Sequence, residues 1–510
     1  MGHGFIHSLQ DKNVFSVTWE LIPGRGSRET VQKRAILSAE EAAKGDKVHA
    51  LTITDNAGGN PALLADYLGE EISKLGIDPL VHFTCKDKNR NQIESQLHAL
   101  DRAGVYNLLV MTGDYPRAGY KGRSKPVFDL DPTHILELIS QMNSGLIVKG
   151  VQGPHTNKPS QFYAGAVVSP FKATEAEQMV QYFKLKKKVA AGAQFIITQL
   201  GYDARKFHEV LEFKRLHRLN VPVIGAIYVL NYPAAKIMNR NKLPGCVVTD
   251  KLLSEVGQEG DTLDSGLSAG LIRAAKLYAL LKGMGYDGVH IGGNNLQYQH
   301  VEYIIEKGNE LSGDWLQLIP EFDYPIPGGF YYFEKDVYNG LNSQTPVDCK
   351  KLPRNAPVNW FYYLMRMMHD LAFTPDKGLF PLMQKIYKGK DPRPHAFEHV
   401  MKVLIADCKD CGDCALLDLA YLCPMSQCPK GQRNGACGGS FNGWCEVYPD
   451  RKQCIYVRAY ARLKACSQES QLESYRVDPV DWELYQTSSW SNFFLGKDHS
   501  ARILGIKPPL

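Results

Sequence analysis

The sequence lacks any apolar run that approaches the ~20 residues a helix needs to span a bilayer. Its first residues, MGHGFIHSLQDKNVF, lack the basic end and apolar centre of a signal peptide. It also lacks a basic stripe, because its 59 Lys and Arg and 54 Asp and Glu are spread along the chain and leave a net charge of +5. These absences argue against a membrane span and against nucleic acid as a partner, and we expect a cytoplasmic protein.

Cysteine is scarce in the first 400 residues, which contain only Cys85, Cys246 and Cys349. The other nine cysteines all lie between Cys408 and Cys466. In a reducing compartment, clustered thiols are metal ligands more often than disulfide partners. We therefore expect the cysteine-rich region to bind metal.

What remains is the composition of an ordinary globular protein. The 510 residues are 44% hydrophobic and 22% charged, which excludes wholesale disorder and fibrous repeats. A chain of this length suits two to four domains, or one large barrel with a second region.

Short β-branched runs alternate with longer amphipathic segments from residue 14 to about residue 308. This alternation is typical of βα units around a parallel sheet. Eight runs qualify as strands, and they begin at Val14, His49, Pro79, Asn107, Ala164, Phe195, Val221 and Asp287. No GxGxxG motif follows the first run, which weighs against a doubly wound sheet. We therefore predict an α/β fold built on a closed (β/α)8 TIM barrel.

Three regions are expected along the chain. Residues 1–310 form the barrel. Residues 311–355 are too aromatic for a solvated tether, so we expect a connecting segment that packs on the barrel. Residues 356–510 form an α-rich, cysteine-rich metal-binding domain that ends in a polar tail.

Polar residues stand where the predicted strands end, which is where a barrel of this kind carries its active site. They are Glu20, then Thr54, Asp55 and Asn56, then His82, then Thr112, Gly113 and Asp114, then Thr198 and Gln199. For any one of them, a role as a capping or loop residue is the more frequent explanation. Glu20 is the exception, because a carboxylate within VFSVTWELIP is costly to bury without a partner or a role. We expect burial to raise its pKa and to give it general-acid capacity.

Eight cysteines follow a regular spacing that suits metal ligands. They are Cys408, Cys411, Cys414, Cys423, Cys428, Cys437, Cys445 and Cys454. CxxCxxC with a distant fourth cysteine is typical of a [4Fe–4S] cluster, whereas CxxC pairs suit tetrahedral zinc equally well. His395 and His399, spaced i and i+4, would add zinc ligands, although such a pair more often decorates a helix surface. Eight thiolates suffice for two four-coordinate sites, and the choice between iron–sulfur and zinc stays open.

Six motifs in order and spacing resemble those of methylenetetrahydrofolate reductase, a flavin-dependent (β/α)8 family of one-carbon metabolism. They are VTWELIP, TITDNAGG, VHFTCKD, LLVMTGDYP, LKKKVAAGAQFIITQ and VPVIGAIYVLNY, and the resemblance covers about residues 10–308. Residues 355–470 resemble the small iron–sulfur or zinc partner subunit of acetogen-type members of the family, here fused behind the barrel.

The resemblance implies interconversion of 5,10-methylenetetrahydrofolate and 5-methyltetrahydrofolate by hydride transfer from or to FAD. Glu20 aligns with the general acid that protonates folate N10, and Asp114 with the aspartate beside the flavin N1/C2 carbonyl. Gln199 aligns with a glutamine that binds the pterin, and Tyr232 with a ring that stacks on folate or nicotinamide. The implied cofactor contacts are Thr54, His82, Thr112, Gly113, Asp114, Lys172, Lys187 and Lys188, of which the last two suit the diphosphate.

The chain departs from the family pattern at three places. Leu21-Ile22-Pro23-Gly24 follows the acid where two aromatics and two prolines are usual. Thr112 replaces an arginine found in many members, and the arginine that reaches the glutamate tail of folate falls near Leu296. These departures bear on how a nicotinamide and the folate tail are bound, and they leave the reaction class unchanged.

The resemblance of the cysteine-rich region implies that electrons pass between an iron–sulfur cluster and the flavin. A ferredoxin-like redox protein is then a candidate partner, beside NAD(P)H acting with a purely structural zinc module. Two other classes fit the same residues: a pterin-binding methyltransferase barrel, and a non-catalytic scaffold. An oligomer is possible in every case.

Overall fold

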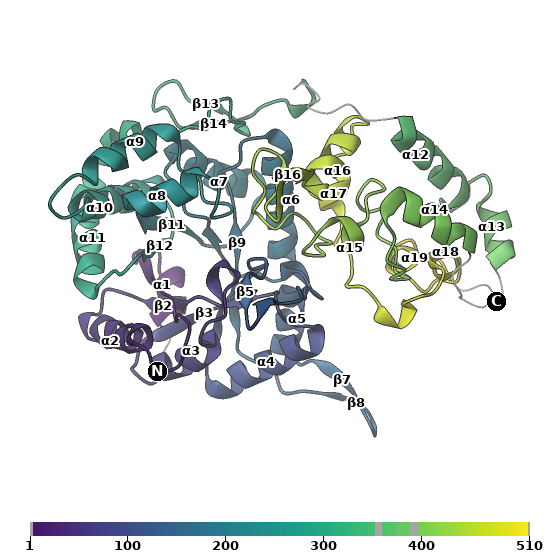
Figure 1. The fold of residues 1–510 in the computed structure, drawn as a ribbon, viewed down its shortest axis with the longest axis horizontal. Helices are drawn as coiled ribbons and strands as arrows, with labels where there is room; N and C mark the ends of the chain where they lie inside the picture. The colour runs from purple at the N-terminus through teal and green to yellow at the C-terminus, as the bar shows by residue number, and fades with distance from the viewer. Residues whose placement is uncertain (1–3, 352–359, 376, 388–395, 508–510) are drawn as a thin grey trace.

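The computed structural model describes residues 4–351, 360–375, 377–387 and 396–507. Eight parallel strands close a barrel in the order β1-β12-β11-β10-β9-β4-β3-β2. All eight predicted runs form these strands, so the predicted fold is confirmed (Figure 1). The barrel strands are β1 (Ser16–Leu21), β2 (Ala50–Ile53), β3 (Asp78–Thr84), β4 (Asn107–Met111), β9 (Tyr163–Val168), β10 (Phe195–Thr198), β11 (Val223–Val229) and β12 (Gly288–Gly293).

Helices surround the barrel and begin at capping side chains such as Asn89, Asp131 and Thr174, which accept hydrogen bonds from free backbone N–H groups. The helices are α2 (Thr30–Gly45), α3 (Ala65–Ser73), α4 (Arg90–Ala103), α5 (Pro132–Ser144), α6 (Glu175–Ala190), α7 (Ala204–Leu216), α8 (Tyr232–Asn239), α9 (Asp250–Glu259), α10 (Leu267–Met284) and α11 (Tyr298–Leu311). Two hairpins interrupt this pattern: β5 (Ala118–Gly119) with β6 (Gly122–Arg123), and β7 (Ile147–Gly150) with β8 (Gly153–Thr156).

The amino end of the barrel is closed by a short helix that the strand pattern does not reveal, α1 (Gly4–Gln10). Phe5 of α1 is fully buried, and its ring packs edge-on against Tyr163 and Phe195, which begin β9 and β10. Gly165 makes room for this packing, because a Cβ there would lie 2.3 Å from the Phe195 ring. The opposite, carboxyl end of the barrel is therefore the end that can bind ligands.

The segment after α11 packs on the barrel. It contains η2 (Ser312–Phe322) and a hairpin of β13 (Phe333–Lys335) and β14 (Asn342–Pro346), followed by η3 (Cys349–Lys351). Buried charges on α7 hold it: Lys206 Nζ donates to the carbonyl of Phe330 at 2.7 Å, and Glu209 accepts from the Tyr332 N–H at 2.6 Å. Each buried charge is thus paired with a polar group, as burial requires.

The cysteine-rich region is formed mainly of short helices joined by irregular loops. Its elements are α12 (Trp360–Ala372), α13 (Phe380–Tyr387), α14 (Ala396–Ala406), α15 (Pro424–Gln427), β15 (Trp444–Cys445), β16 (Tyr448–Gln453), α16 (Ile455–Lys464), α17 (Gln471–Ser474), η4 (Trp482–Leu484), α18 (Ser489–Phe494) and α19 (His499–Ile503). One of its contacts with the barrel is made by α16, which lies beside α6 (Figure 1). Tyr460 and Lys464 of α16 both bind the buried carboxylate of Glu175.

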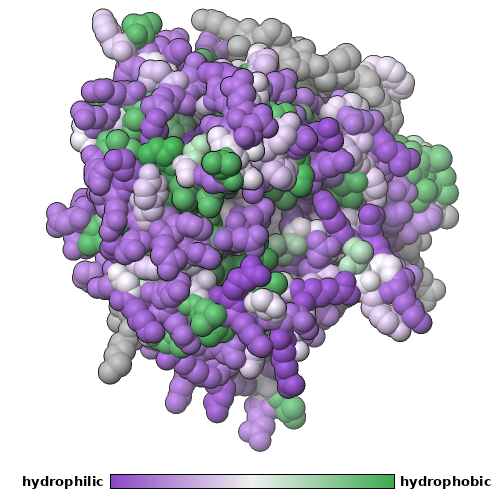
Figure 2. Space-filling view, turned by 60° about the vertical axis from the view of Figure 1, so that its left-hand side comes forward, coloured by the Kyte–Doolittle hydropathy of each residue, from purple (hydrophilic) through white to green (hydrophobic). Residues whose placement is uncertain are grey.

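In the part of the chain that the structure describes, no helix is both long and apolar enough to cross a membrane. On the face shown in Figure 2, hydrophilic side chains predominate and hydrophobic ones lie in small groups.

A buried histidine is one of the residues that link the C-terminal tail to the cysteine-rich region. His499 lies between the carboxylates of Asp413 and Asp418, with Arg433 also in contact. Burial alone would lower the pKa of His499, but hydrogen bonds to the two carboxylates outweigh burial and raise it to about 9.

We expect alkaline pH to weaken this link. Because the pKa of His499 is higher in the folded state than its ordinary 6.5, its contribution is complete below pH 6.5 and is lost as pH rises through about 9. The Tm of the wild-type protein should be lower at pH 9.5 than at pH 6. In His499→Gln this difference in Tm should be much smaller. An equal fall in both proteins would contradict the assignment.

Candidate active site

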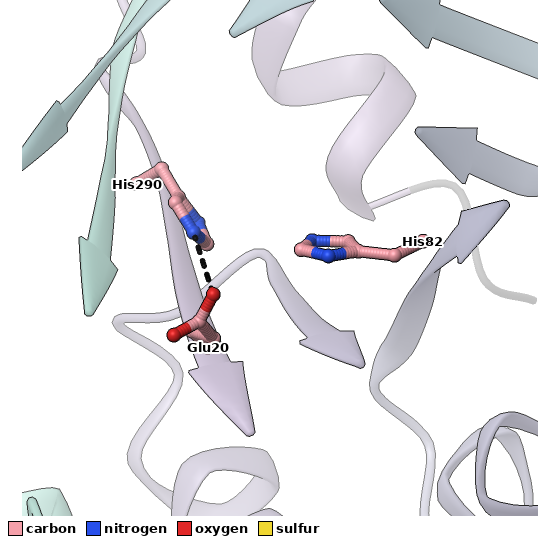
Figure 3. A group of neighbouring side chains, drawn as sticks. All are labelled: Glu20, His82 and His290. Carbon is pink, nitrogen blue, oxygen red and sulfur yellow. Dashed lines mark ion pairs between the residues drawn. The ribbon is translucent and has the colours of Figure 1, made fainter. Parts of the chain in front are cut away.

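Three ionisable side chains meet at the carboxyl end of the barrel. Glu20, His82 and His290 come from β1, β3 and β12, and one ligand atom from each lies within 4.8 Å of the other two (Figure 3). Glu20 Oε2 lies 3.8 Å from His290 Nε2, and the Glu20 side chain is 22% exposed. The arrangement offers a proton-carrying group open to a ligand, and its donor set would also suit a divalent metal ion.

The strand register explains how His290 reaches Glu20. β12 pairs with β1 directly, so His290 lies opposite Thr18, two residues before Glu20. Thr18 Oγ1 lies 3.0 Å from His290 Nδ1, which orients the other ring nitrogen toward the carboxylate. His290 was not singled out from the sequence. The signal was present, because a histidine in the middle of DGVHIGG is a titratable group within a buried strand.

The expected rise in the pKa of Glu20 is wrong for this state of the protein. Burial does act to raise the pKa, but the hydrogen bond and ion pair with His290 outweigh burial, and the pKa lies below its ordinary value. The sequence could not reveal this, since His290 follows Glu20 by 270 residues and meets it only because the barrel closes. Burial lowers the pKa of His82 to about 4, so this ring is neutral near pH 7.

Two of the expected flavin contacts carry polar atoms that lack partners among the described residues. Thr54 Oγ1 and His82 Nε2 are both buried and make no hydrogen bond. Buried polar atoms are almost always satisfied in folded proteins. These two therefore fit a site whose remaining hydrogen bonds come from a ligand.

Thr112, Gly113 and Asp114 follow β4 and reach the same end of the barrel. The Asp114 carboxylate accepts a hydrogen bond from the Gly58 N–H at 2.7 Å. Gly113 has a φ of +79°, and a Cβ there would lie 2.9 Å from Thr84, so the turn requires glycine. This turn holds the Asp114 backbone in one position.

The lysines expected at the cofactor are deeply buried. Lys172 donates to the carbonyls of Gly438 and Ser440, and Lys188 donates to the carbonyl of Val167 at 2.6 Å. Burial lowers the pKa of Lys187 to about 8 and that of Lys188 to about 7. Their role toward a diphosphate stays a prediction.

The C-terminal region also supplies partners to the barrel that the sequence did not suggest. Gln432 Oε1 accepts from Thr112 Oγ1 at 3.1 Å and from Lys184 Nζ at 2.9 Å. Lys430 Nζ donates to the Gly113 carbonyl at 2.7 Å. The segment between Cys428 and Ser440 therefore lies on the carboxyl-end face of the barrel.

The two expected substrate contacts lie on different elements. Gln199 follows β10, and its Oε1 accepts from the next backbone N–H at 2.9 Å. Tyr232 begins α8 and packs against α9, its ring 3.3 Å from the position of a Cβ at Gly257. Lys236 Nζ lies 4.3 Å from the centre of the Tyr232 ring. Their contact with folate stays a prediction.

The eight regularly spaced cysteines divide into two groups, each lining its own cavity. The first group is Cys408, Cys411, Cys414 and Cys423, and the second is Cys428, Cys437, Cys445 and Cys454. None of the twelve cysteines, all of which lie in the described residues, forms a disulfide. Each group thus places four sulfur atoms around one cavity, and metal binding there stays a prediction.

Each group has its own buried lysine and glutamate. At the first group, Lys402 Nζ lies 3.7 Å from Cys414 Sγ and 2.8 Å from Glu398. At the second, Lys430 pairs with Glu446, whose Oε1 lies 3.5 Å from Cys437 Sγ.

His399, one of the two histidines considered as zinc ligands, does not line either cysteine cavity. His399 is about half exposed, and its Nδ1 lies 3.0 Å from Asp410. His395 lies outside the described residues.

The fold and this cluster of residues define a (β/α)8-barrel protein with an acid at the carboxyl end of its strands and an attached eight-cysteine region. Residues 6–298, more than half of the chain, match the family model described as methylenetetrahydrofolate reductase. Residues 387–483 match the model described as methylene-tetrahydrofolate reductase C terminal. The chain belongs to the methylenetetrahydrofolate reductase family.

Curated relatives match over part of the barrel. Methylenetetrahydrofolate reductase (NADH) 1 of Arabidopsis thaliana is 29% identical over 189 residues, which cover 35% of this chain and 30% of the relative. Methylenetetrahydrofolate reductase 1 of Schizosaccharomyces pombe is 24% identical over 259 residues, which cover 50% of this chain and 40% of the relative. The chain thus spans less than half the length of these relatives.

Among solved structures, one match is a Clostridium thermocellum protein described as binding two copies of 5-methyl-5,6,7,8-tetrahydrofolic acid. It has a TM-score of 0.43 and 14% identity, and the match covers 61% of this chain and 99% of that one.

Proposed function

We propose that this protein interconverts 5,10-methylenetetrahydrofolate and 5-methyltetrahydrofolate with bound FAD. The observation that carries the proposal is the Glu20–His290 pair at the carboxyl end of a barrel of this family. A partly exposed carboxylate beside a histidine can hold a proton and release it to a ligand nitrogen. Folate supplies such a nitrogen in N10.

The barrel residues fit FAD at several positions. Thr54 and His82 would hydrogen-bond it with the buried atoms that lack partners in the described chain, and Asp114 would lie beside the ring from its fixed turn. Bound FAD supplies hydride transfer, which no side chain provides. The neutral His82 ring adds no charge to this pocket near pH 7.

Glu20 acts by carrying the proton that opens the folate ring. Without substrate its carboxylate form is favoured, because His290 lies beside it. A bound pterin would cover the exposed part of the side chain, and the added desolvation would move the pKa upward. The acid would therefore be protonated when substrate is present and shielded from water.

The cysteine groups fit two metal centres, and their spacing favours iron–sulfur clusters. Four thiolates at about 2.3 Å from one zinc ion lie roughly 3.8 Å from one another. Among the described residues, only one group of three or more candidate ligand atoms has all its members within 4.8 Å of one another. That group is Glu20, His82 and His290. No three sulfurs of either group are that close, which suits a larger cluster. Such clusters supply one-electron transfer.

Electrons would then pass between the flavin and a redox protein such as a ferredoxin through the cysteine-rich region. The contact of the segment between Cys428 and Ser440 with the barrel supports this route. The second candidate is the same reductase with structural zinc in both cysteine groups and NAD(P)H as donor, which the NADH-named relative favours.

One preparation tests the proposal. Protein purified without oxygen should show flavin absorbance, contain iron and acid-labile sulfide, and oxidise methyltetrahydrofolate with an artificial acceptor. Stoichiometric zinc without iron would favour the second candidate. A colourless protein that transfers a methyl group to a corrinoid acceptor would be a pterin-binding methyltransferase and would overturn the proposal.

His290 should set the pH range of folate turnover. Its pairing helps to hold the Glu20 pKa below the ordinary value, so His290→Gln should raise that pKa. The limb of the kcat/KM profile that reports loss of the Glu20 proton should move to higher pH. Thr18→Val removes the hydrogen bond that orients the His290 ring but keeps the ring itself. It should move this limb of the profile in the same direction by a smaller amount. A limb that stays in place in both variants would contradict the role of His290.

A further inference from the structure

One of the buried side chains that join the second cysteine group to the barrel is Lys430. Lys430 is 3% exposed and lies two residues after Cys428. Its Nζ pairs with the Glu446 carboxylate and donates to the Gly113 carbonyl at 2.7 Å. Lys430 therefore touches both the cysteine-rich region and the turn that carries Asp114.

The same contacts continue to the sulfur ligands. Glu446 directly follows Cys445, and its Oε1 lies 3.5 Å from Cys437 Sγ. Gly439 makes room for this carboxylate, since a Cβ at that position would collide with Glu446 Oε2. An unbroken series of contacts thus runs from Cys437 through Glu446 and Lys430 to Gly113.

The first cysteine group has a similar lysine with different partners. Lys402 lies 3.7 Å from Cys414 Sγ and binds Glu398 and Ser489, which both belong to the cysteine-rich region. The two lysines form a natural comparison, because each is buried, paired with a glutamate and next to a sulfur ligand. They differ in that Lys430 reaches the barrel.

We propose that Lys430 is a positioning residue that couples the second cysteine group electrostatically to the Gly113–Asp114 turn, which makes this group the metal centre nearest the flavin. The inference rests on the proposed function. Its physical basis is the long range of charge interactions in a buried, poorly solvated setting. An electron added to the second centre changes the electrostatic potential at the Lys430–Glu446 pair. That pair in turn changes the electrostatic potential in the pocket of Asp114.

The test is the midpoint potential of the flavin in the full-length protein purified without oxygen. A positive charge near the ring favours the reduced, more negative flavin. Lys430→Met should therefore shift the potential to lower values, and Lys430→Arg should restore it toward the wild-type value. Glu446→Gln leaves Lys430 unpaired and should shift the potential upward. This opposite sign keeps the proposal testable if Lys430→Met fails to fold.

Lys402→Met is the matched control. It removes the same kind of buried charge beside the other cysteine group and should leave the flavin potential at the wild-type value. Flavin and metal content of each variant exclude loss of a cofactor as the cause. Equal potentials in wild type, Lys430→Met and Glu446→Gln, or an equal shift in Lys402→Met, would overturn the inference alone. Wild-type protein without bound flavin would contradict it together with the proposed function.

Discussion

Glu20→Gln is expected to lower folate turnover by at least about 100-fold, the usual lower limit for loss of a general acid. Glutamine has nearly the same shape as glutamate but cannot give up a proton to folate N10. Flavin content and flavin reduction by an artificial donor should remain at wild-type values, because the expected flavin contacts Thr54, His82 and Asp114 are unchanged. Steady-state folate turnover and an anaerobic flavin titration on the same preparation measure the two effects.

The control for this variant is Glu302→Gln on α11. It makes the same chemical change in an ion pair with Lys47, whose side chain is 33% exposed. Surface pairs of this kind contribute at most about 1 kcal/mol, so folate turnover should stay unchanged. Undiminished turnover in Glu20→Gln would show that another group supplies the proton.

Loss of one cysteine from either group is expected to remove about half of the bound metal. Cys411→Ser should empty the first site and Cys437→Ser the second, because a four-thiolate centre rarely keeps its metal with three ligands. If both centres are [4Fe–4S] clusters, iron should fall from about eight to about four atoms per chain in each variant. Iron and sulfide analysis after anaerobic purification measures this.

Combined variants test the division into two groups. Cys411→Ser with Cys414→Ser should lose no more metal than Cys411→Ser alone, since both residues line the first cavity. Cys411→Ser with Cys437→Ser should lose nearly all of it. Cys466→Ser, outside both groups, is the control and should keep full metal content. A double variant within one group that loses all metal would contradict the division.

The barrel could be predicted from the sequence because its signals are local. A buried parallel strand needs a short run of β-branched residues, and each run here is followed by a helical period. The polar residues at strand ends, Glu20 and Asp114 among them, could be predicted for the same reason. Helix α1 was missed, since its packing depends on Phe5 meeting the starts of strands far along the chain.

The cysteine spacing predicted metal ligands but did not say which cysteines share a centre. Regular spacings of two and eight residues allow several groupings, and only the course of the backbone sets Cys423 with the first group and Cys428 with the second. The contact of Lys430 with Gly113 joins residues 317 positions apart. No pattern in the sequence predicts a contact between residues so far apart.

The sequence by itself determined the barrel, and it predicted Glu20 as the acid and a cysteine-rich metal-binding region, because short runs, periodicities and spacings reflect interactions between residues that are close in the sequence. Only the tertiary structure decided the direction of the pKa shift of Glu20 and the contacts between the two regions. Closure of the barrel brings His290 beside Glu20 and turns an expected upward pKa shift into a downward one. The packing of residues 428–440 on the strand ends brings Lys430 to the turn of Asp114, since a buried charge must find its partners wherever the fold supplies them.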